Sequence, residues 1–241
     1  MKKGKKIIIT IGVILLLLTA FLVFALYNNG YSGWHRHSEA KENQIKVACV
    51  GDSITYGHGI KAWAKNNYPV KLQKILGDFY HVENFGHSGK TLSKNGDQPY
   101  VESEQYMLSL EYCADIVVIM LGTNDSKPEN WTDETDFIEQ YEEFINSYKE
   151  KNPDVEIILC TPARAFFPDG ESDGLTSYDI QPKIVESIRN RIRTFALLNS
   201  YKCVDIYSVT ENHGEWFSDR VHPSNEGALA IAEAIAKKII E

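Results

Sequence analysis

Ser53 stands where an α/β protein places its catalytic groups, because it follows an apolar run that ends in glycine. Residues 47–50 are Val-Ala-Cys-Val and run directly into Gly51-Asp52-Ser53. A continuous apolar run of this kind predicts a strand of a parallel sheet that is buried on both faces. Ligands of such sheets bind beyond the carboxyl ends of the strands, which makes Ser53 a candidate nucleophile. An ordinary strand-to-turn boundary, where Gly, Asp and Ser are all common, is the competing interpretation.

A serine nucleophile needs a base and an acid that orients the base, and the segment around His222 offers both. Asp219 precedes His222 by three residues, in a loop ahead of the last helical stretch. A short turn can bring the Asp219 carboxylate to one imidazole nitrogen and leave the other nitrogen to take the proton of Ser53. A histidine before a proline is, on its own, equally typical of an ordinary loop. Asp205, on the fifth expected strand, is the next candidate for the acid.

Two further loops carry groups that can stabilise an oxyanion. Residues 84–91 are Asn-Phe-Gly-His-Ser-Gly-Lys-Thr, and their glycines let the backbone come close to a substrate. Residues 122–125 are Gly-Thr-Asn-Asp, where Asn124 offers a side-chain amide. A turn in the first loop and a helix cap in the second explain each loop alone. The order of all four segments along the chain, each after an expected strand, favours one shared site.

Strand-like and helix-like stretches alternate from residue 45 onward. The strand-like stretches are residues 45–50, 81–84, 115–121, 155–161 and 202–206. Apolar residues at helical spacing mark helices around residues 137–148, 184–196 and 228–239, with Ser224 as the expected N-cap of the last. This alternation predicts an α/β fold, a three-layer α/β/α sandwich with right-handed crossovers around a parallel sheet.

The four segments together resemble those of the SGNH hydrolases, also called the GDSL esterase family. The resemblance covers residues 45–241. It implies the family's fold, a flavodoxin-like sheet of five parallel strands, and it implies the family's catalytic groups. Those groups are Ser53 as nucleophile, Asp219 and His222 as acid and base, and Asn124 and a glycine amide as oxyanion donors. Spacing from Asn84 places that glycine at Gly89 rather than Gly86.

The substrate expected from the sequence is small and carbohydrate-based. Ser53 lacks the flanking glycines of the G-x-S-x-G motif, so the chain does not match the larger α/β-hydrolases. There is no long lid insertion, which favours small acyl groups over long-chain lipids. Residues 127–131 and 164–167 are expected to overhang the site, and their aromatic and polar groups suit a sugar ring, although Trp131 fits a packing role equally well. Within the family, the chain is most similar to exported carbohydrate O-acetylesterases, including sialate and plant-polysaccharide deacetylases.

These features predict a serine esterase that removes acyl groups, chiefly acetyl, from a glycan through an acyl-enzyme. No metal or organic cofactor is needed for that chemistry. Lysophospholipase or thioesterase activity is the alternative within the family, and a non-catalytic glycan-binding module is the alternative outside enzymes. The complete set of Ser, His, Asp, Gly and Asn argues against a binding module, which has no use for a triad.

The N-terminus predicts a membrane segment. Four lysines precede residues 7–26, which carry no charge and are long enough as a helix to span a bilayer. Lysines on the N-terminal side predict a cytoplasmic N-terminus and an exported remainder. We expect residues 1–27 to be an uncleaved anchor, with a cleaved signal peptide as the alternative, and residues 28–44 to be a polar linker. His35 and His37 in that linker form an H-x-H pair that is more often incidental than metal-binding.

Charge and cysteine content restrict the partners. The net charge is −8, and because the first 26 residues hold four lysines and no acid, the remainder carries −12. An acidic body argues against binding to nucleic acid. The four cysteines lack C-x-x-C spacing, so a zinc site is not indicated, and buried free thiols are expected. These thiols are Cys49, Cys113, Cys160 and Cys203. Disulfides are the alternative, because an even number of cysteines in an exported chain permits them.

Overall fold

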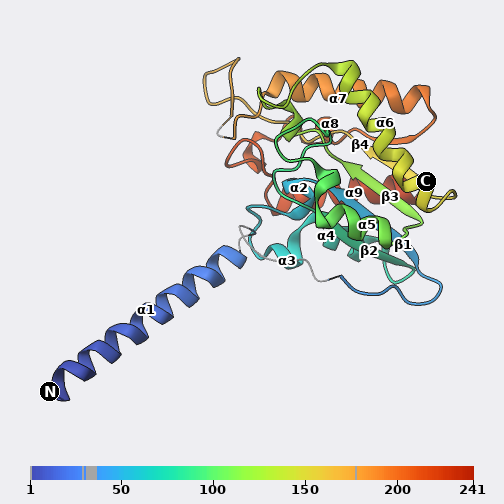
Figure 1. Cartoon of the computed structure of the whole chain (residues 1–241). Helices are drawn as coiled ribbons and strands as arrows, with labels where there is room; N and C mark the ends of the chain where they lie inside the picture. The colour runs from blue at the N-terminus through green and yellow to red at the C-terminus, as the bar shows by residue number, and fades with distance from the viewer. Residues whose placement is uncertain (1, 29, 31–36, 177) are drawn as a thin grey trace.

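The computed structural model describes residues 2–28, 30, 37–176 and 178–241, which form one α/β domain preceded by a long helix (Figure 1). Five parallel strands make one sheet in the order β2-β1-β3-β4-β5. This is the flavodoxin-like order, in which β1 and β3 lie side by side at the switch point of the sheet. The predicted fold class is therefore confirmed.

The strands fall at the expected positions and differ only at their ends. Their bounds are Ile45–Gly51 (β1), Tyr80–Gly86 (β2), Ile116–Met120 (β3), Glu156–Cys160 (β4) and Lys202–Val204 (β5). Gly51, the last residue of β1, pairs with Gly86 on β2 and Met120 on β3. Because the strands are parallel, the loops after β1, β2 and β3 all begin at the same edge of the sheet.

Helices cover both faces of the sheet (Figure 1). One face packs against α4 (Tyr68–Leu76) and α9 (Asn225–Ile240), with the short helices α3 (Trp63–Asn66) and α8 (Ile206–Thr210) beside them. The other face packs against α5 (Glu104–Glu111), α6 (Glu134–Lys151) and α7 (Pro182–Leu198). The central strands contribute to both cores because successive side chains point to opposite faces: Val118 belongs to the first core and Val117 to the second.

The helical spacing read from the sequence corresponds to buried faces. In α6 the side chains of Phe137, Tyr141, Phe144, Ile145 and Tyr148 are all buried. The final helix begins where expected, since the hydroxyl of Ser224 accepts a hydrogen bond from the Gly227 amide and acts as the N-cap. The helices that cover the sheet thus present one apolar face to it, which is what holds the three layers together.

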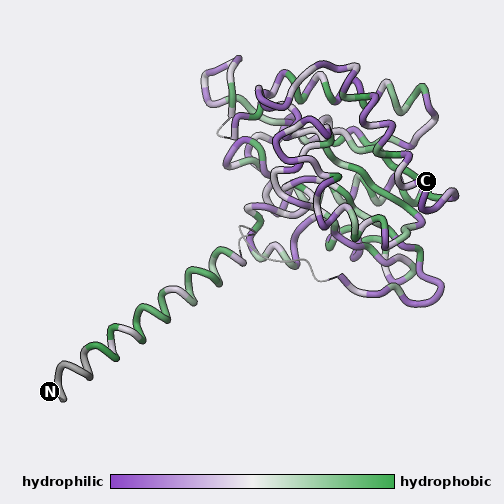
Figure 2. Tube along the Cα trace, viewed as in Figure 1, coloured by the Kyte–Doolittle hydropathy of each residue, from purple (hydrophilic) through white to green (hydrophobic). Residues whose placement is uncertain are grey.

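Helix α1 (Lys2–Asn28) extends away from the domain (Figure 1), and most of its length is coloured as hydrophobic (Figure 2). The large apolar side chains from Ile8 to Tyr27 are exposed. Within the described residues it is the one helix long and apolar enough to cross a membrane, over Ile8–Asn28. The end of α1 contacts the domain. The Tyr27 ring lies edge-on to Trp63 at 5.7 Å, and the Ala62 amide donates to the Asn28 carbonyl at 2.5 Å.

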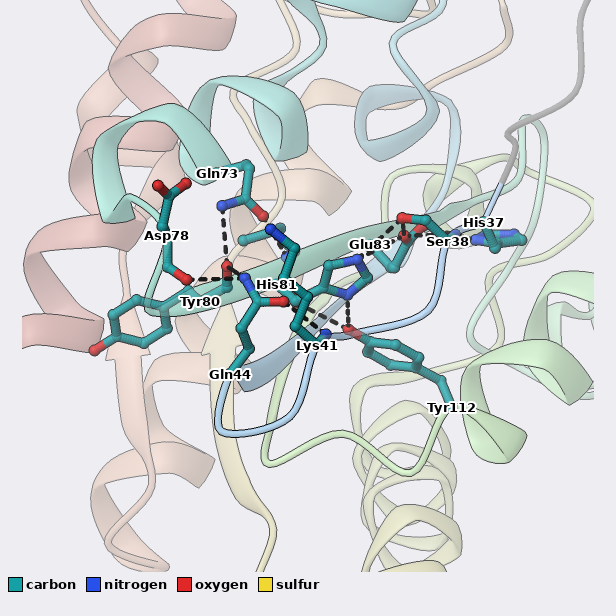
Figure 3. A network of polar contacts seen from close by, with 11 residues as sticks. His37, Ser38, Lys41, Gln44, Gln73, Asp78, Tyr80, His81, Glu83 and Tyr112 are labelled. Carbon is teal, nitrogen blue, oxygen red and sulfur yellow. Dashed lines mark hydrogen bonds and ion pairs between the residues drawn. The ribbon is translucent and has the colours of Figure 1, made fainter.

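Part of the expected linker contacts the edge of the sheet (Figure 3). Glu83 on β2 accepts hydrogen bonds from the Ser38 amide (2.9 Å) and hydroxyl (2.7 Å) and pairs with the His37 ring at 3.0 Å. Gln44 donates to the Tyr80 carbonyl at 3.2 Å. Residues 37, 38 and 44, within the segment expected to be a polar linker, therefore contact the outer strand β2. His35 lies outside the described residues.

The four cysteines are all free, but they are not all buried. Cys49 and Cys160 are buried on strands, and Cys203 is partly buried on the edge strand β5. The prediction of a buried thiol is wrong for Cys113, which is exposed. This residue lies in the turn between α5 and β3, with φ +47°, and not on the strand itself.

Candidate active site

Ser53 is presented at the carboxyl end of β1, as the first residue of the short helix α2 (Ser53–Tyr56). Asp52 caps that helix, because its carboxylate accepts a hydrogen bond from the Ile54 amide at 2.9 Å. The turn requires glycine at position 51. A Cβ there would lie 2.6 Å from the Met120 carbonyl oxygen and 2.0 Å from the Thr55 hydroxyl. The close approach of β1, β3 and α2 therefore fixes where the Ser53 hydroxyl points.

His222 joins Ser53 to Asp219. Its Nε2 lies 2.9 Å from Ser53 Oγ, and its Nδ1 lies 2.7 Å from Asp219 Oδ2. The other carboxylate oxygen of Asp219 accepts hydrogen bonds from the amides of Val221 (3.0 Å) and His222 (2.7 Å). Because the backbone turns at Arg220, where φ is +74°, the Asp219 carboxylate comes back to the ring of His222, three residues later in the chain. The three side chains predicted to act together are in contact.

The electrostatics keep Asp219 ionised. Partial burial favours the neutral acid, but hydrogen bonds from the His222 ring and from the His222 and Val221 amides outweigh it and hold the pKa of Asp219 well below its usual value. An ionised carboxylate at Nδ1 fixes the imidazole tautomer with Nδ1–H donating to Asp219. The free Nε2 lone pair then faces the Ser53 hydroxyl, the arrangement a general base requires.

Gly89 and Asn124, the predicted oxyanion donors, line the same cavity as Ser53 and His222. Gly89 has φ +81°, a conformation that glycine adopts without strain. The Asn124 side-chain nitrogen donates to the Lys90 carbonyl at 3.1 Å, which uses one of its two hydrogens.

Asn84 and Gly86 support the site from below. The Asn84 side chain donates to the Thr55 carbonyl and accepts from the Gly86 amide, both at 2.8 Å. A Cβ on Gly86 would lie 2.2 Å from the Tyr56 nitrogen, so this glycine serves the packing of β2 against α2. Gly89 lines the cavity, and Gly86 is not among its lining residues.

Two buried carboxylates lie beneath the site. Burial raises the pKa of Asp52 to about 6, against the hydrogen bond from Ile54. Burial also raises the pKa of Asp125 to about 6, although its carboxylate accepts from the Ser93 (2.8 Å) and Leu92 (3.0 Å) amides. By holding those two amides, Asp125 fixes the loop after β2 next to the loop after β3.

His58 and Tyr178 are cavity residues that the sequence analysis missed. The centroids of the His58 and His222 rings lie 4.5 Å apart. The Tyr178 ring is edge-on to the His222 ring, with 5.0 Å between their centroids. Burial, and then the neighbouring His222, lower the pKa of His58 to about 4, so His58 is neutral at physiological pH. Its position between Gly57 and Gly59, directly after the nucleophile turn, is the one sequence signal that could have identified it.

The two predicted overhanging loops behave differently. In the first, Lys127 lines the cavity, but Trp131 packs against Phe137 at 6.2 Å, which is the packing role. The second, residues 164–167, does not line the cavity: Phe166 packs on Phe217 at 5.1 Å. Tyr178 and Ile180, further along the same connection, provide that wall instead.

Asp205, the alternative acid, belongs to a different interaction. Its carboxylate pairs with the Arg189 guanidinium at 2.7 Å and caps α8. Arg189 donates to both carboxylate oxygens, which is bidentate pairing. Asp205 therefore has a structural partner of its own. Over the part of the chain that the structure describes, no cluster of three or more His, Cys, Asp or Glu residues is arranged to hold a metal ion.

A Ser–His–Asp contact at the carboxyl ends of the strands of a parallel α/β sheet is an arrangement that serine hydrolases also have. Comparison with known proteins specifies the family. The model of the GDSL-like lipase/acylhydrolase family matches residues 49–230. The chain belongs to this family, as the resemblance read from its sequence implied.

The chain is also similar to individual esterases. The chain is 37% identical over 221 residues to an acetylxylan esterase of Xylanibacter ruminicola, covering 83% of this chain and 44% of that protein. The chain thus spans less than half the length of that relative. It is similar in fold to a carbohydrate acetylesterase of Sinorhizobium meliloti (17% identity, TM-score 0.63, covering 82% of this chain and 99% of that one). An aryl esterase of M. smegmatis is also similar (16% identity, TM-score 0.65, 81% and 98% covered).

Proposed function

We propose that this chain is a serine esterase that removes acetyl groups from a carbohydrate. The observation that supports the proposal most strongly is the continuous contact from Ser53 Oγ through the His222 ring to the Asp219 carboxylate. The name of the acetylxylan esterase relative supports the acetyl and carbohydrate parts of the proposal. A non-catalytic binding module has no need of a hydroxyl aligned with a base in this way.

The proposed mechanism runs through an acyl-enzyme. Ser53 Oγ attacks the ester carbonyl carbon while His222 Nε2 takes its proton. The oxyanion of the tetrahedral intermediate accepts hydrogen bonds from the Ser53 and Gly89 amides and from the Asn124 side chain. Collapse releases the alcohol, which takes the proton from His222. Water, deprotonated by His222, then attacks the acyl-enzyme, and the acid leaves as Ser53 is reprotonated.

The size of the catalytic cavity favours a short acyl group. Its volume is about 150 Å³, and Ile180 and Val221 form part of its wall. Pockets for drug-sized ligands usually hold roughly 300–1,000 Å³, so a long acyl chain has little room here. This observation favours acetyl esters over the lysophospholipids or long-chain thioesters that other members of the family could process.

We also propose that residues 1–27 anchor the protein in a membrane, with the catalytic domain, residues 45–241, outside the cytoplasm. The exposed apolar surface of α1 supports this placement. A spanning helix resists high salt, whereas electrostatic attachment does not. The full-length protein should therefore stay with membranes after a high-salt wash. A mature N-terminus near Tyr27, found by peptide sequencing, would instead show a cleaved signal peptide.

The function is tested by comparing substrates on purified protein. Acetylated xylan fragments and p-nitrophenyl acetate should be hydrolysed, and lysophosphatidylcholine and palmitoyl thioester should be hydrolysed far more slowly. The Ser53→Ala variant is the control for contaminating esterases. Equal or faster release of the long acyl groups would reject the acetylesterase assignment, and no hydrolysis of any ester would favour a binding role.

A further inference from the structure

A second cavity meets the catalytic cavity at His222 and Tyr178, which line both. It has a volume of about 340 Å³. Its wall continues from Asp219 through the start of α9 and returns along the loop before α3, where Lys61 lies. We infer that this second cavity binds the sugar that carries the ester, beside the bond that is cleaved. The inference rests on the proposed esterase function.

The side of His222 on which this cavity lies identifies the part of the substrate it receives. The leaving alcohol takes its proton from His222, so the alcohol must lie next to the His222 ring and not next to the oxyanion donors. The second cavity has both His222 and Asp219 in its wall, whereas Gly89 and Asn124, the oxyanion donors, line only the first. The acyl group therefore occupies the first cavity and the alcohol extends into the second.

The lining of the second cavity matches a hydroxyl-rich molecule. Lys61, Ser218, Ser224 and Glu226 supply donors and acceptors, and all but Ser224 are exposed. Sugar hydroxyls both donate and accept, so they can pair with such a set, whereas a lipid chain would leave these groups unpaired. Tyr178 is 39% exposed and lines both cavities, so it adds an aromatic surface where they meet.

The charges of this cavity favour a neutral sugar over a phosphate-bearing alcohol. The wall of this cavity carries the cation of Lys61 and the carboxylates of Asp219 and Glu226. Glu226 also lies in the first turn of α9, where a negative side chain offsets the positive end of the helix dipole. A hydrogen bond from Ser224 lowers the pKa of Glu226, so this carboxylate is ionised at neutral pH. A lysophospholipid headgroup would meet no uncompensated positive charge here.

The test uses two variants at the cavity and two matched controls outside it. Lys61→Ala and Glu226→Ala remove one polar group each from the second cavity. Lys65→Ala on α3 and Glu233→Ala on α9 remove the same side chains from exposed positions that do not line it. Each protein is assayed with acetylated xylobiose and with p-nitrophenyl acetate, whose leaving group is not a sugar.

The expected result is a change in KM that is specific to the sugar ester. Loss of one hydrogen bond corresponds to roughly a fivefold to tenfold loss of binding. The ratio of KM for acetylated xylobiose to KM for p-nitrophenyl acetate should rise by about fivefold or more in Lys61→Ala and Glu226→Ala. The controls should keep the wild-type ratio. Equal ratios in all four variants would overturn the inference while leaving the esterase function intact.

A binding measurement separates this inference from the esterase proposal. Unacetylated xylobiose should bind to the Ser53→Ala protein in calorimetry, with an affinity lowered by Lys61→Ala and unchanged by Lys65→Ala. This readout needs no turnover, so an enzyme without ester hydrolysis that still binds xylobiose through Lys61 would reject the function and keep the sugar subsite. Absence of xylobiose binding to the Ser53→Ala protein would reject the subsite.

Discussion

Among the residues that the structure describes, histidine contacts a buried or half-buried carboxylate in two regions of the domain. One is the pair His222–Asp219 at the carboxyl ends of the strands, and the other is the cluster of His37 and His81 around Glu83 on the outer strand β2 (Figure 3). The closest ring-to-carboxylate contacts are similar, 2.7 Å in the first region and 3.0 Å in the second. A histidine–carboxylate contact is therefore common to a candidate catalytic site and to a structural one.

The second ring nitrogen of each histidine distinguishes the two regions. His37 Nε2 contacts Gln105 at 3.3 Å, and the two nitrogens of His81 contact the Tyr112 and Ser38 hydroxyls at 2.6 and 3.0 Å. His222 Nε2 contacts Ser53, which lines a cavity. The edge cluster uses its rings to fasten residues 37–44 to β2. At the other region one nitrogen faces a nucleophile that a substrate can reach.

The largest expected difference between the regions is in ester hydrolysis. Ser53→Ala and His222→Ala should each lower kcat by roughly 10³- to 10⁶-fold, as removal of triad members does in serine hydrolases. His81→Ala, a matched histidine variant at the edge cluster, should keep the parental kcat. Rates of p-nitrophenyl acetate hydrolysis by variants of equal far-ultraviolet circular dichroism make the comparison. A large loss of kcat in His81→Ala would show that the edge cluster also takes part in ester hydrolysis.

Asp219→Asn should lower the rate by about 10⁴-fold, because an amide does not hold the imidazole in the required tautomer. Rates of p-nitrophenyl acetate hydrolysis at several pH values measure this loss. Asp205→Asn is the control, since Asp205 pairs with Arg189. Its pH profile should match that of the wild type. An Asp219→Asn protein with parental rate and profile would show that the acid comes from elsewhere.

Asn124→Ala should have a smaller effect, about 10²- to 10³-fold on kcat with KM nearly unchanged, because the donor acts on charge that develops in the transition state. Steady-state kinetics on p-nitrophenyl acetate separate the two constants. The thermal midpoint of unfolding should also be measured, to show that the variant is folded. The Asn130 side chain donates to the backbone carbonyl of residue 124, and this contact is retained in the alanine variant. An effect on KM alone would make Asn124 a substrate-binding residue.

The smallest effect on activity and a measurable effect on stability are expected at Glu83. Glu83→Gln should lower the free energy of unfolding by about 1–3 kcal/mol at pH 7, because the buried Glu83 side chain would no longer offer His37 and Ser38 a charged acceptor. Despite burial, hydrogen bonds from His37 and Ser38 lower the pKa of Glu83 in the folded state. Its stabilisation is therefore complete above the unfolded-state pKa and declines as pH falls through the lower folded pKa.

Urea unfolding at several pH values checks this prediction. The difference between wild type and Glu83→Gln should be largest at neutral pH and should shrink in acid. The variant should hydrolyse p-nitrophenyl acetate at the parental rate. A difference that grows toward acid pH would contradict the sign of the shift, and a loss of activity would link the edge cluster to the site.

The two regions also differ in how well their residues could be predicted from the sequence. Ser53, Asn124 and His222 follow apolar strands or precede a periodic helix, so the topology of a parallel sheet placed them at one edge. Glu83 and His81 lie within a strand, where nothing in the sequence signals which distant segment will cover them. The helices α4 and α5 were not predicted, because each is short and its apolar pattern is brief.

Residues from irregular loops were the hardest to predict at the site. Tyr178 comes from a long connection without periodicity, and it reaches His222 only through the fold. The same connection misled the prediction for residues 164–167, where Phe166 packs inward on Phe217. Loop side chains of this kind are placed by tertiary contacts, which a local pattern does not encode.

The most direct test of the difference between the two regions is covalent labelling of the nucleophile. Diethyl p-nitrophenyl phosphate reacts with an activated serine: Oγ bonds to phosphorus and p-nitrophenolate leaves. Peptide mass spectrometry should find the diethylphosphoryl group on Ser53 in the wild type and in His81→Ala, and little or none in His222→Ala after the same time. Labelling of another serine, or equal labelling of Ser53 without His222, would contradict the assignment of Ser53 and His222 as nucleophile and base.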